Sequence, residues 1–459
     1  HPGAASSASA AAPEDGPVQP RLRRHRRKAG LLLRERSQAG PSLPGGPPRW
    51  LETHIWHAKR SAMEDIWGFR LAARNSQLGR RALYRASGQH CCVHDRSYME
   101  VLELVGSEEA IVKALSLCGV SRRSSMLGPV LHGQRRLRTN LFQFPGDVAA
   151  KEATATSGER SASARLVAPV LLLWCPEASD ALQADEAEPF CIDVGPEAAA
   201  ATGGAEDVPM EAVESPALVR RLWVWLHPAA AQAGIAALSR AAAEVASRGA
   251  DPVTLRPLAG CFLEVMGPAA LETLARVLPA AACDGNSAAL WAEVAARSVG
   301  MRLALPPGAV LALSIDMNAL RDCATEKALP GTASGEAPWL ARWPPTAVAG
   351  SSLWQALPEV GSVTGVEASA QGSEGTKKFT PLLLVFRGDS SVDVILPPHS
   401  GLAQLWLRCI FAGARVLGFR NRHELYLEAG QPDFPFDFPE SEAGAAEQAT
   451  VAERNLQGF

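Results

Sequence analysis

The sequence predicts a mixed α/β protein in which strands are followed by helices. Apolar residues recur from Met99 to Leu104 as in a strand. Gly106-Ser107 then precedes Glu108 and Glu109, which favour the first turn of a helix. The same order recurs at Leu263–Gly267, where an apolar strand ends in glycine and Pro268 suits the first helical position. Strand–helix units of this kind are typical of an α/β fold.

These two units contain the similar sequences LELVG and LEVMG. They indicate either a weak internal duplication or the ordinary recurrence of strand–helix units in an α/β protein. Between them, Leu222–Leu226 is expected to be a buried strand, and His227-Pro228 leads into a helix rich in alanine.

The C-terminal part continues the alternation. Pro381–Phe386 and Val392–Leu396 are expected to pair as strands across a turn at Gly388-Asp389. Ser400 is expected to cap an apolar helix that reaches about Phe411.

A short strand and a last helix are expected to follow. Ala414–Leu417 has the pattern of the strand, and Asn421 with Glu424 has the spacing of a capping box at the helix start. The run from Asp433 to Pro439 alternates Pro, Phe and Asp, so we expect it to lie extended over a surface with its Phe rings as anchors.

Composition divides the chain into segments. Residues 1–20 are rich in Ala, Ser and Pro and are expected to be disordered. An N-terminal domain at 49–324 carries insertions of low complexity, rich in Ala and acidic residues, which are also expected to be disordered. The remaining expected boundaries are a basic arm and hinge at 21–48, insertions at 146–163 and 177–217, a linker at 325–378, a second domain at 379–444 and a tail at 445–459.

Charge is distributed unevenly, although the net charge is only −3 at pH 7. Residues 21–140 contain 23 Lys and Arg against 9 Asp and Glu, whereas the rest of the chain is acidic. A polarised field of this kind suits an anionic partner, such as nucleic acid, on one side of the molecule.

The arm opens with a dense basic run. Guanidinium and ammonium groups neutralise phosphates, but such runs also occur as nuclear-import signals or solvated tails. Because aromatic residues are interleaved with basic residues just downstream, we interpret the run as part of an arm that contacts RNA. Its predicted RNA-binding residues are Arg23, Arg24, Arg26, Arg27 and Lys28.

The segment WLETHIWHAKR, residues 50–60, combines two Trp, two His, one Lys and one Arg; we call it the signature segment. Trp and His rings offer flat faces on which unpaired bases stack. The near-helical spacing of Leu51, Ile55, Met63 and Ile66 favours a helix, and an extended segment is the alternative. The RNA-binding residues predicted here are His54, Trp56, His57, Lys59 and Arg60.

Other residues support no catalytic site. His54 and His57 are spaced for metal binding, but no third ligand accompanies them, so RNA stacking or a structural role is expected. His94, Asp95 and Ser97 are too close in sequence for the geometry of a catalytic triad. The sequence has no phosphate-binding glycine-rich motif. We therefore expect no catalytic residue, no metal and no cofactor.

Nine cysteines without a CxxC pair favour reduced thiols in a cytosolic or nuclear setting. No apolar run is long enough to span a bilayer, so no membrane partner is expected. Because residue 1 is His, we expect that the chain lacks its native start.

The signature segment resembles that of the largest protein subunit of eukaryotic ribonuclease P and ribonuclease MRP. The surrounding sequence agrees, from Trp67-Gly68-Phe69 through RRALYRA at Arg80 to CCVHDRSYMEVLEL at Cys91. A second block from Thr380 to Gly444 resembles the other domain of that family, the POPLD-type domain. Its landmarks are PLLLVFRG, DVILPPHSGLAQLW, FAGARVLGFR and DFPFDFPESEAG.

The resemblance implies a non-catalytic scaffold in the nucleus and nucleolus. In this family the removal of the tRNA 5′ leader is attributed to the RNA component, and the protein supports tRNA and rRNA processing. The implied partners are ribonuclease P RNA, ribonuclease MRP RNA and smaller protein subunits, with precursor tRNA as an indirect partner. The resemblance also implies a fold similar to the glycine-cleavage T-protein, an aminomethyltransferase, without carrying its function.

Within the resembling blocks, three more arginines are predicted RNA contacts. Arg85 belongs to RRALYRA, and Arg415 and Arg420 follow small residues that would let an RNA backbone approach. Ordinary surface ion pairs are the alternative for the last two. Members of the family usually continue beyond the second block, so we expect a short form or a partial gene product.

Two other functions stay open. A folate-dependent enzyme similar to aminomethyltransferases would bind folate stoichiometrically and would not need the arm. A generic RNA or chromatin factor with a basic arm would bind duplex DNA as well as structured RNA.

Overall fold

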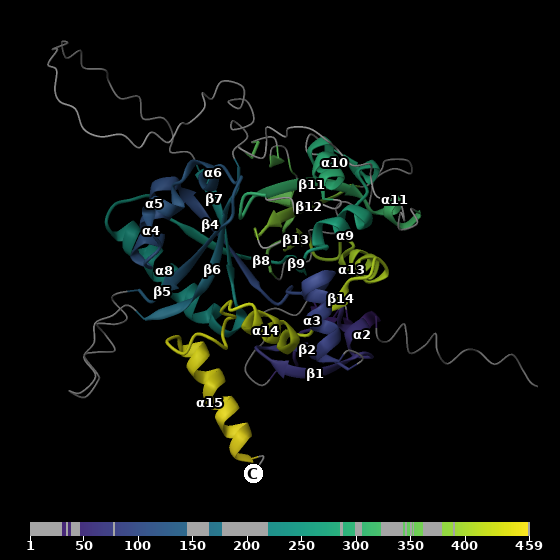
Figure 1. Cartoon of the computed structure of the whole chain (residues 1–459). Coiled ribbons are helices and arrows are strands. Elements are labelled where there is room, and N and C mark those ends of the chain that lie inside the picture. Colours follow the sequence, from purple (N-terminus) through teal and green to yellow (C-terminus); the bar gives the residue numbers. More distant parts are fainter. Residues whose placement is uncertain are drawn as a thin grey trace, which may run out of the picture.

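The computed structural model describes most of the chain outside the N-terminal arm and the insertions. The described residues are 30–33, 35–37, 46–76, 79–144, 165–176, 219–284, 288–298, 305–322, 343–344, 347–348, 351, 353–360, 379–388 and 391–457. They form two large sheets that lie side by side, with helices on their outer faces and a two-stranded hairpin at one end (Figure 1). The expected mixed α/β class is confirmed.

The signature segment begins the first described group of elements. Helix α2 (His54–His57) is a single turn, and strands β1 (Ser61–Ile66) and β2 (Phe69–Asn75) form an antiparallel hairpin (Figure 1). Trp67 and Gly68 join the strands with φ of 54° and 80°, which makes a tight hairpin turn. Helix α3 (Arg80–Gln89) follows.

The five-stranded sheet has the order β5-β6-β7-β4-β8, and all its neighbours are antiparallel. Helices α4 (Glu108–Leu117) and α8 (Ala231–Ser247) cover one face, where Ile111, Leu115 and Leu238 are buried. The strands are β4 (Glu100–Ser107), β5 (Leu137–Phe142), β6 (Leu166–Trp174), β7 (Val219–Leu226) and β8 (Thr254–Leu258).

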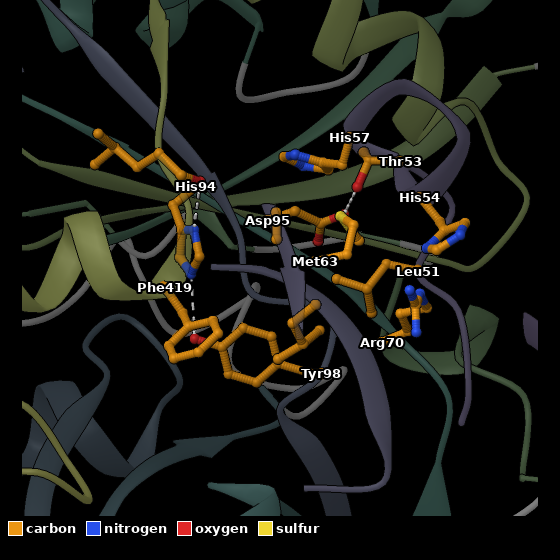
Figure 2. Close-up of a pocket in the computed structure, with 13 residues that line it drawn as sticks. Leu51, Thr53, His54, His57, Met63, Arg70, His94, Asp95, Tyr98 and Phe419 are labelled. Atoms are coloured by element: carbon orange, nitrogen blue, oxygen red, sulfur yellow. Dashed lines mark hydrogen bonds between the residues drawn. The ribbon is translucent and has the colours of Figure 1, made fainter. Parts of the chain in front are cut away.

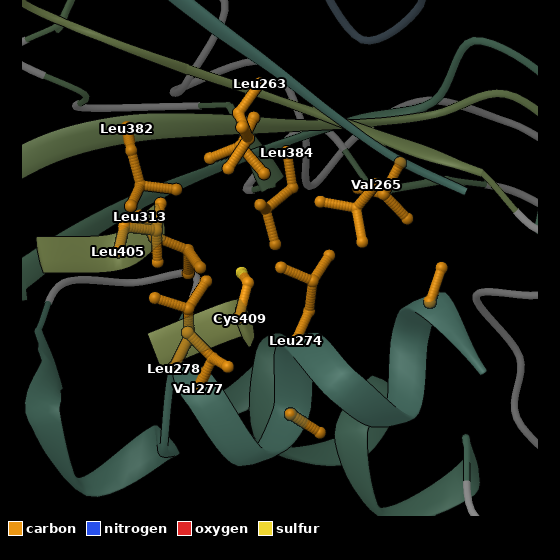
Figure 3. Packing of buried hydrophobic residues seen from close by; sticks show 14 of the residues in the cluster. Leu263, Val265, Leu274, Val277, Leu278, Leu313, Leu382, Leu384, Leu405 and Cys409 are labelled. Carbon is orange, nitrogen blue, oxygen red and sulfur yellow. The ribbon is translucent and has the colours of Figure 1, made fainter. Parts of the chain in front are cut away.

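The seven-stranded sheet has the order β10-β11-β12-β13-β9-β3-β14, and only β3 and β14 run parallel. On one face, Leu274 and Cys409 pack against strand residues such as Leu263 and Leu384 (Figure 3). The strands are β3 (Cys92–Asp95), β9 (Cys261–Met266), β10 (Cys283–Asp284), β11 (Val310–Asp316), β12 (Phe379–Phe386), β13 (Val392–Leu396) and β14 (Arg415–Val416), and the helices on this face include α9 (Ala270–Val277), α10 (Ala288–Arg297) and α13 (Leu402–Phe411).

The inner faces of the two sheets meet in a shared core. Trp223 and Trp225 of β7 belong to the same buried cluster as Phe262 of β9 and Leu383 of β12. Since large aromatic side chains bury much apolar area, this cluster contributes strongly to holding the sheets together. The second expected domain is therefore not a separate sheet, because β12 and β13 lie between β11 and β9.

The remaining helices lie at the edges of the sheets. Helix α14 packs against β2, and α15 extends away from the body (Figure 1). None of the described helices is long and apolar enough to cross a membrane. The further helices are α5 (Arg122–Ser125), α6 (Gly128–Leu131), α11 (Met317–Asp322), α12 (Leu353–Ala356), α14 (Phe419–Glu428) and α15 (Glu442–Gln457).

The predicted strand–helix units are confirmed. LELVG forms β4 before α4, LEVMG forms the end of β9 before α9, and LWVWL lies in β7 before α8. The two similar units lie in different sheets. The pairing of the strands at 381–386 and 392–396 is also confirmed.

Three local predictions were wrong. The helix expected through Met63 and Ile66 is one turn long, because both residues lie in β1. Gly401, with φ of 118°, is the N-cap of α13, while the Ser400 hydroxyl donates to Pro397 O. The N-cap of α14 is Gly418 instead of Asn421, which is the third helical residue and accepts from Gly418 N through its Oδ1 atom.

The C-terminal region differs from the prediction in two further ways. Residues 433–440 fold into turns rather than lying extended, although Phe438 is buried as an anchor. Helix α15 follows α14, so the expected tail at 445–459 is largely helical. Part of the expected linker is core as well, since Trp343 and Trp354 are buried.

Candidate nucleic-acid interface

The signature segment is tied to the neighbouring strand by side-chain hydrogen bonds. Thr53 Oγ1 donates to Asp95 Oδ2, and Asp95 Oδ1 accepts from Ser97 N at 2.9 Å. Trp50 stacks on His54, with ring centres 4.0 Å apart and planes 15° apart. Figure 2 shows Thr53 directed at Asp95, with His54 and His57 on either side. These contacts fix the short α2 turn against the end of β3.

The histidines of this region are neutral side chains in the interior. His54 and His57 are only 5% and 4% exposed, so neither offers a ring face to an RNA base. Burial, followed by the charges of His94 and His54, lowers the pKa of His57 to about 3. Burial also lowers the pKa of His54. A structural role, one of the two expected roles, therefore fits both rings.

The cavity beside these rings is too small for a ligand. It has a volume of about 10 Å³, which is roughly the space of one water molecule. Within the described parts of the chain, His, Cys, Asp and Glu form no group of three that could hold a metal ion.

His94, Asp95 and Ser97 do not form a relay. The Nδ1 atom of His94 lies 3.0 Å from Leu417 O, and its Nε2 atom lies 3.2 Å from the Tyr98 hydroxyl. Burial lowers the pKa of His94 to about 3, so the ring is neutral near pH 7. The ring connects β3 to the chain after β14.

The signature segment also contacts the second block of family resemblance. Trp56 packs edge-on against Trp406 of α13, with ring centres 5.7 Å apart, and His57 lies 5.0 Å from the same ring. Glu52 Oε1 accepts from His399 N at 2.6 Å. We call these five residues the joint. Through them the signature residues hold the two blocks together.

The hairpin adds polar contacts to α14. Arg420 binds both carboxylate oxygens of Glu64 at 2.7 and 2.8 Å, and Asn421 Oδ1 accepts from Asn75 N at 3.0 Å. The ion pair with Glu64 raises the pKa of Arg420. Two roles were open for Arg420, an RNA contact or an ion pair. In the structure its guanidinium forms an ion pair with Glu64.

Gly418 allows close packing of protein on protein. A Cβ at this position would lie 2.2 Å from Ala73 O, so α14 could not approach β2 so closely with any other residue. Gly413, in contrast, has no atom within 4 Å of a Cβ built there. Arg415 beside it is exposed on β14. Of the two small-residue sites predicted for an RNA backbone, only the one at Arg415 is open.

Several exposed lysine and arginine side chains lie in the signature segment and in α3. Lys59, Arg81 and Arg85 are exposed, and none makes a hydrogen bond or ion pair with a described residue. Arg80, also exposed, lies 3.7 Å from Glu424. We call these four residues the α3 basic surface. Arg60, predicted with Lys59, is half-buried and lies over the Trp56 ring at 4.8 Å.

A backbone hydrogen bond joins the end of β2, which precedes α3, to the signature segment. Ser76 N donates to Arg60 O at 3.0 Å, and α3 begins four residues after Ser76. Arg81 and Arg85 are one turn apart, while Leu83 and Ala86 point into the core. Arg80 and Arg81 were missed from the sequence, although the buried spacing of Leu83 and Ala86 signals an amphipathic helix. The arm residues Arg23, Arg24, Arg26, Arg27 and Lys28 lie outside the described residues.

Two family models match the chain. "Ribonucleases P/MRP protein subunit POP1, N-terminal" matches residues 48–107, and "POPLD (NUC188) domain" matches residues 391–459. The first range contains the signature segment and the second contains α13 and α14. The resemblance identified from the sequence is confirmed in both blocks.

Three curated relatives carry the corresponding name. The human ribonucleases P/MRP protein subunit POP1 is 51% identical over 72 residues, which are 16% of this chain and 7% of that protein. The Caenorhabditis elegans subunit popl-1 is 55% identical over 49 residues, 11% and 6% of the two chains. The Arabidopsis thaliana POP1 subunit is 25% identical over 272 residues, 57% and 30%. The chain thus spans less than a third of each relative's length.

Among solved structures, the aminomethyltransferase T of the glycine cleavage system from Bartonella henselae aligns with 84% of this chain and 64% of its own. The TM-score is 0.39 and the identity is 13%. This is the fold to which the sequence resemblance pointed, but similarity at this level carries no argument about structure or function.

Proposed function

We propose that this chain, which carries the N-terminal and POPLD domains of the POP1 subunits, is a non-catalytic RNA-binding scaffold of ribonuclease P and ribonuclease MRP. In this proposal the protein braces the RNA component, which carries out removal of the tRNA 5′ leader, and it supports rRNA processing in the same way. Its partners would be ribonuclease P RNA, ribonuclease MRP RNA and smaller subunits in the nucleus and nucleolus, with precursor tRNA an indirect partner.

The observation that carries the proposal is the α3 basic surface beside the joint. Its exposed guanidinium and ammonium groups at Lys59, Arg81 and Arg85 have no partner among the described residues. Such groups are free to bind phosphates, which position a protein on RNA without reading its sequence. Two signature rings next to Lys59 in the sequence, those of Trp56 and His57, are held in place by Trp406.

The proposal places RNA contact on charge more than on stacking. In the described part of the signature segment, the two histidines are buried and Trp56 is half-buried, whereas Lys59 is exposed. We expect the arm, whose bases precede this surface in the sequence, to extend the phosphate contacts. Arg415 is retained as a further contact because it is exposed.

A double variant tests this surface. We expect Arg81→Ala with Arg85→Ala to weaken binding of the full chain to ribonuclease P RNA. The slope of log affinity against log salt should fall by about 1 for each phosphate that the protein no longer neutralises. Fluorescence anisotropy at several salt concentrations measures both quantities.

A matched control is Arg122→Ala with Arg123→Ala, two exposed arginines on α5 at the other end of the molecule (Figure 1). This control should leave both affinity and slope unchanged. Equal slopes for wild type and the α3 variant would rule out this surface as the RNA contact. Separately, purification of the protein from its own cells should recover ribonuclease P and MRP RNA as the bound species.

A further inference from the structure

A large cavity lies between the two sheets, away from the signature segment. Its volume is about 780 Å³, within the range of roughly 300–1,000 Å³ that is common for ligand sites. Strands β5 and β6 of the five-stranded sheet line one side, and β13 with the chain before β11 lines the other. Helix α14 and residues 431–434 also contribute to its wall.

Six arginines line this cavity from segments far apart in the sequence. They outnumber the two lining carboxylates, Asp393 and Asp433. Such a surplus of one charge within low-dielectric walls concentrates a positive potential. The arginines are Arg96, Arg135, Arg136, Arg138, Arg387 and Arg422.

Some of these arginines are structural. Arg422 donates from Nε to Glu264 Oε2 at 2.5 Å, and it also bonds to Asp433. Arg387 likewise binds Glu264, which is fully buried. Burial alone would raise the pKa of Glu264, but the charges of Arg422, Arg387 and Arg96 hold it well below its usual value. Glu264 is therefore a buried carboxylate that fixes this part of the wall.

Two other arginines are not satisfied by protein groups. Arg136 is 8% exposed and is paired with Asp393, yet its Nη1 atom is buried without a hydrogen-bond partner. Arg138 is exposed and makes no hydrogen bond or ion pair with a described residue. Buried donors normally have partners, because an unpaired buried donor loses its hydrogen bonds to water without gaining others. The buried Nη1 atom of Arg136 therefore lacks a partner that an anion in the cavity would supply, and the exposed guanidinium of Arg138 is free to bind the same anion.

Crowding of positive charge points the same way. Although part of the Arg138 side chain is exposed to solvent, desolvation by the surrounding protein and then the charge of Arg387 lower its pKa. Burial also lowers the pKa of Arg136, and the charge of Asp393 offsets this decrease only in part. An anion between these guanidiniums would relieve both the desolvation and the repulsion between like charges.

The rest of the wall is apolar and partly aromatic. Met99, Leu127 and Leu171 line it, together with the half-buried ring of Phe434. The Phe434 ring packs edge-on against His227 with centres 5.3 Å apart. A flat heterocycle could pack on such a surface while an attached anion reaches the arginines.

We propose that this cavity binds the phosphate of a nucleotide, with Arg136 and Arg138 as phosphate ligands and the apolar wall around Phe434 as the seat of the base. The nucleotide is either a free nucleoside phosphate or an unpaired nucleotide of a bound RNA. No glycine-rich phosphate motif is involved, because side chains from both sheets supply the donors. The site does not depend on the proposed scaffold function.

Binding of 5′-AMP to the full chain, measured by isothermal titration calorimetry, tests the site. Wild type should bind AMP saturably, and Arg138→Gln should weaken that binding by about tenfold or more, because glutamine lacks the positive charge and the paired donors with which a guanidinium binds phosphate. Arg138 is exposed and unpaired, so this change should not disturb folding. Inorganic phosphate should compete with AMP at higher concentration.

Arg256→Gln is the matched control. Arg256 is an exposed arginine on β8, and Arg138 lies on β5, so the two occupy opposite edges of the same sheet. Arg256 does not line the cavity, and its variant should bind AMP as wild type does. The site is refuted if wild type does not bind AMP saturably. It is also refuted if the two variants bind alike.

Competition identifies the source of the nucleotide. If a single-stranded RNA oligonucleotide displaces AMP, and Arg138→Gln weakens both, an RNA nucleotide enters the cavity. If AMP binds while RNA binding to the α3 basic surface is unaffected by it, the ligand is a free nucleotide. A failure of the Arg81 and Arg85 test would leave this result intact, because those residues do not line the cavity.

Discussion

Trp56 illustrates how one side chain of the signature segment can serve the fold. Its ring lies between the guanidinium of Arg60, 4.8 Å from the ring centre, and Trp406, 5.7 Å away. The ring therefore already has a cation and an aromatic ring as partners in the protein itself. Trp56 and His57, two of the aromatic residues that suggested base stacking in the sequence, instead join the two family domains through Trp406.

We expect Trp56→Ala to destabilise the protein by about 2–4 kcal/mol. Removal of a core aromatic costs about 3–5 kcal/mol, and this ring is only partly buried. A regular duplex hides its base faces, so loss of a stacking ring would weaken only the binding of RNA with unpaired loops. Because we assign the ring to packing, we expect the affinity for looped RNA to fall no more than the affinity for duplex. Urea unfolding and anisotropy on the same preparations measure these effects.

Lys59→Ala is the neighbouring control, since Lys59 is exposed. Its stability should stay within about 0.5 kcal/mol of wild type, while its affinity for both RNAs decreases. A stable Trp56→Ala protein that loses only loop binding would show that the ring stacks on a base.

At the scale of elements, the docking of α14 on β2 depends on a glycine. The Cβ of any other residue at 418 would meet Ala73 O at 2.2 Å and Ala72 O at 2.7 Å. Both are backbone atoms of a paired strand, so they cannot move aside as a side chain could. Asn421 adds the polar contact to Asn75 N from the next turn.

Gly418→Ala should therefore destabilise the protein by about 1–3 kcal/mol or more, the usual cost of overpacking. Gly88→Ala in α3 is the control, because a Cβ there has no atom within 4 Å. It should be neutral or stabilising by up to about 1 kcal/mol, as expected for Gly→Ala in a helix. Equal urea midpoints for the two variants would contradict the packing argument.

For the whole molecule, local patterns predicted most strands and missed what distant segments build together. The alternation at 99–104 and the apolar run at 222–226 identified β4 and β7 correctly. The hairpin was missed, because Met63 and Ile66 have helical spacing in the sequence; Gly68 in its turn was the available signal. A cavity whose arginines range from 96 to 422 has no local signal at all.

The candidate RNA site was predictable only in part, for the same reason. The interleaved aromatic and basic residues identified Lys59, the family resemblance identified Arg85, and both side chains are exposed. Burial of His54 and His57 depends on β3 and α13, which lie elsewhere in the chain. A residue's chemistry can be read from sequence, whereas its exposure is decided by tertiary packing.

Buried neutral histidines give the whole molecule a pH-dependent stability. The pKa of His57 and of His94 is lowered to about 3, mainly by burial, and burial lowers that of His227 well below its usual value. In the unfolded chain these rings titrate near pH 6.5. Between about pH 6.5 and 3 the unfolded state therefore binds more protons, so stability falls as the pH falls.

We expect the urea midpoint to decrease steadily from pH 7 to pH 5. Each histidine that titrates only on unfolding contributes up to about 1.4 kcal/mol per pH unit. Asp95 acts in the opposite direction, because burial raises its pKa and protonation then favours the folded state. Three histidines should outweigh it above pH 5.

The variant His94→Asn tests this assignment. It retains a donor near Leu417 O but cannot titrate, so the slope of its unfolding free energy against pH should be smaller by one proton. A midpoint independent of pH, or an unchanged slope in His94→Asn, would mean that these rings are not neutral in the folded protein.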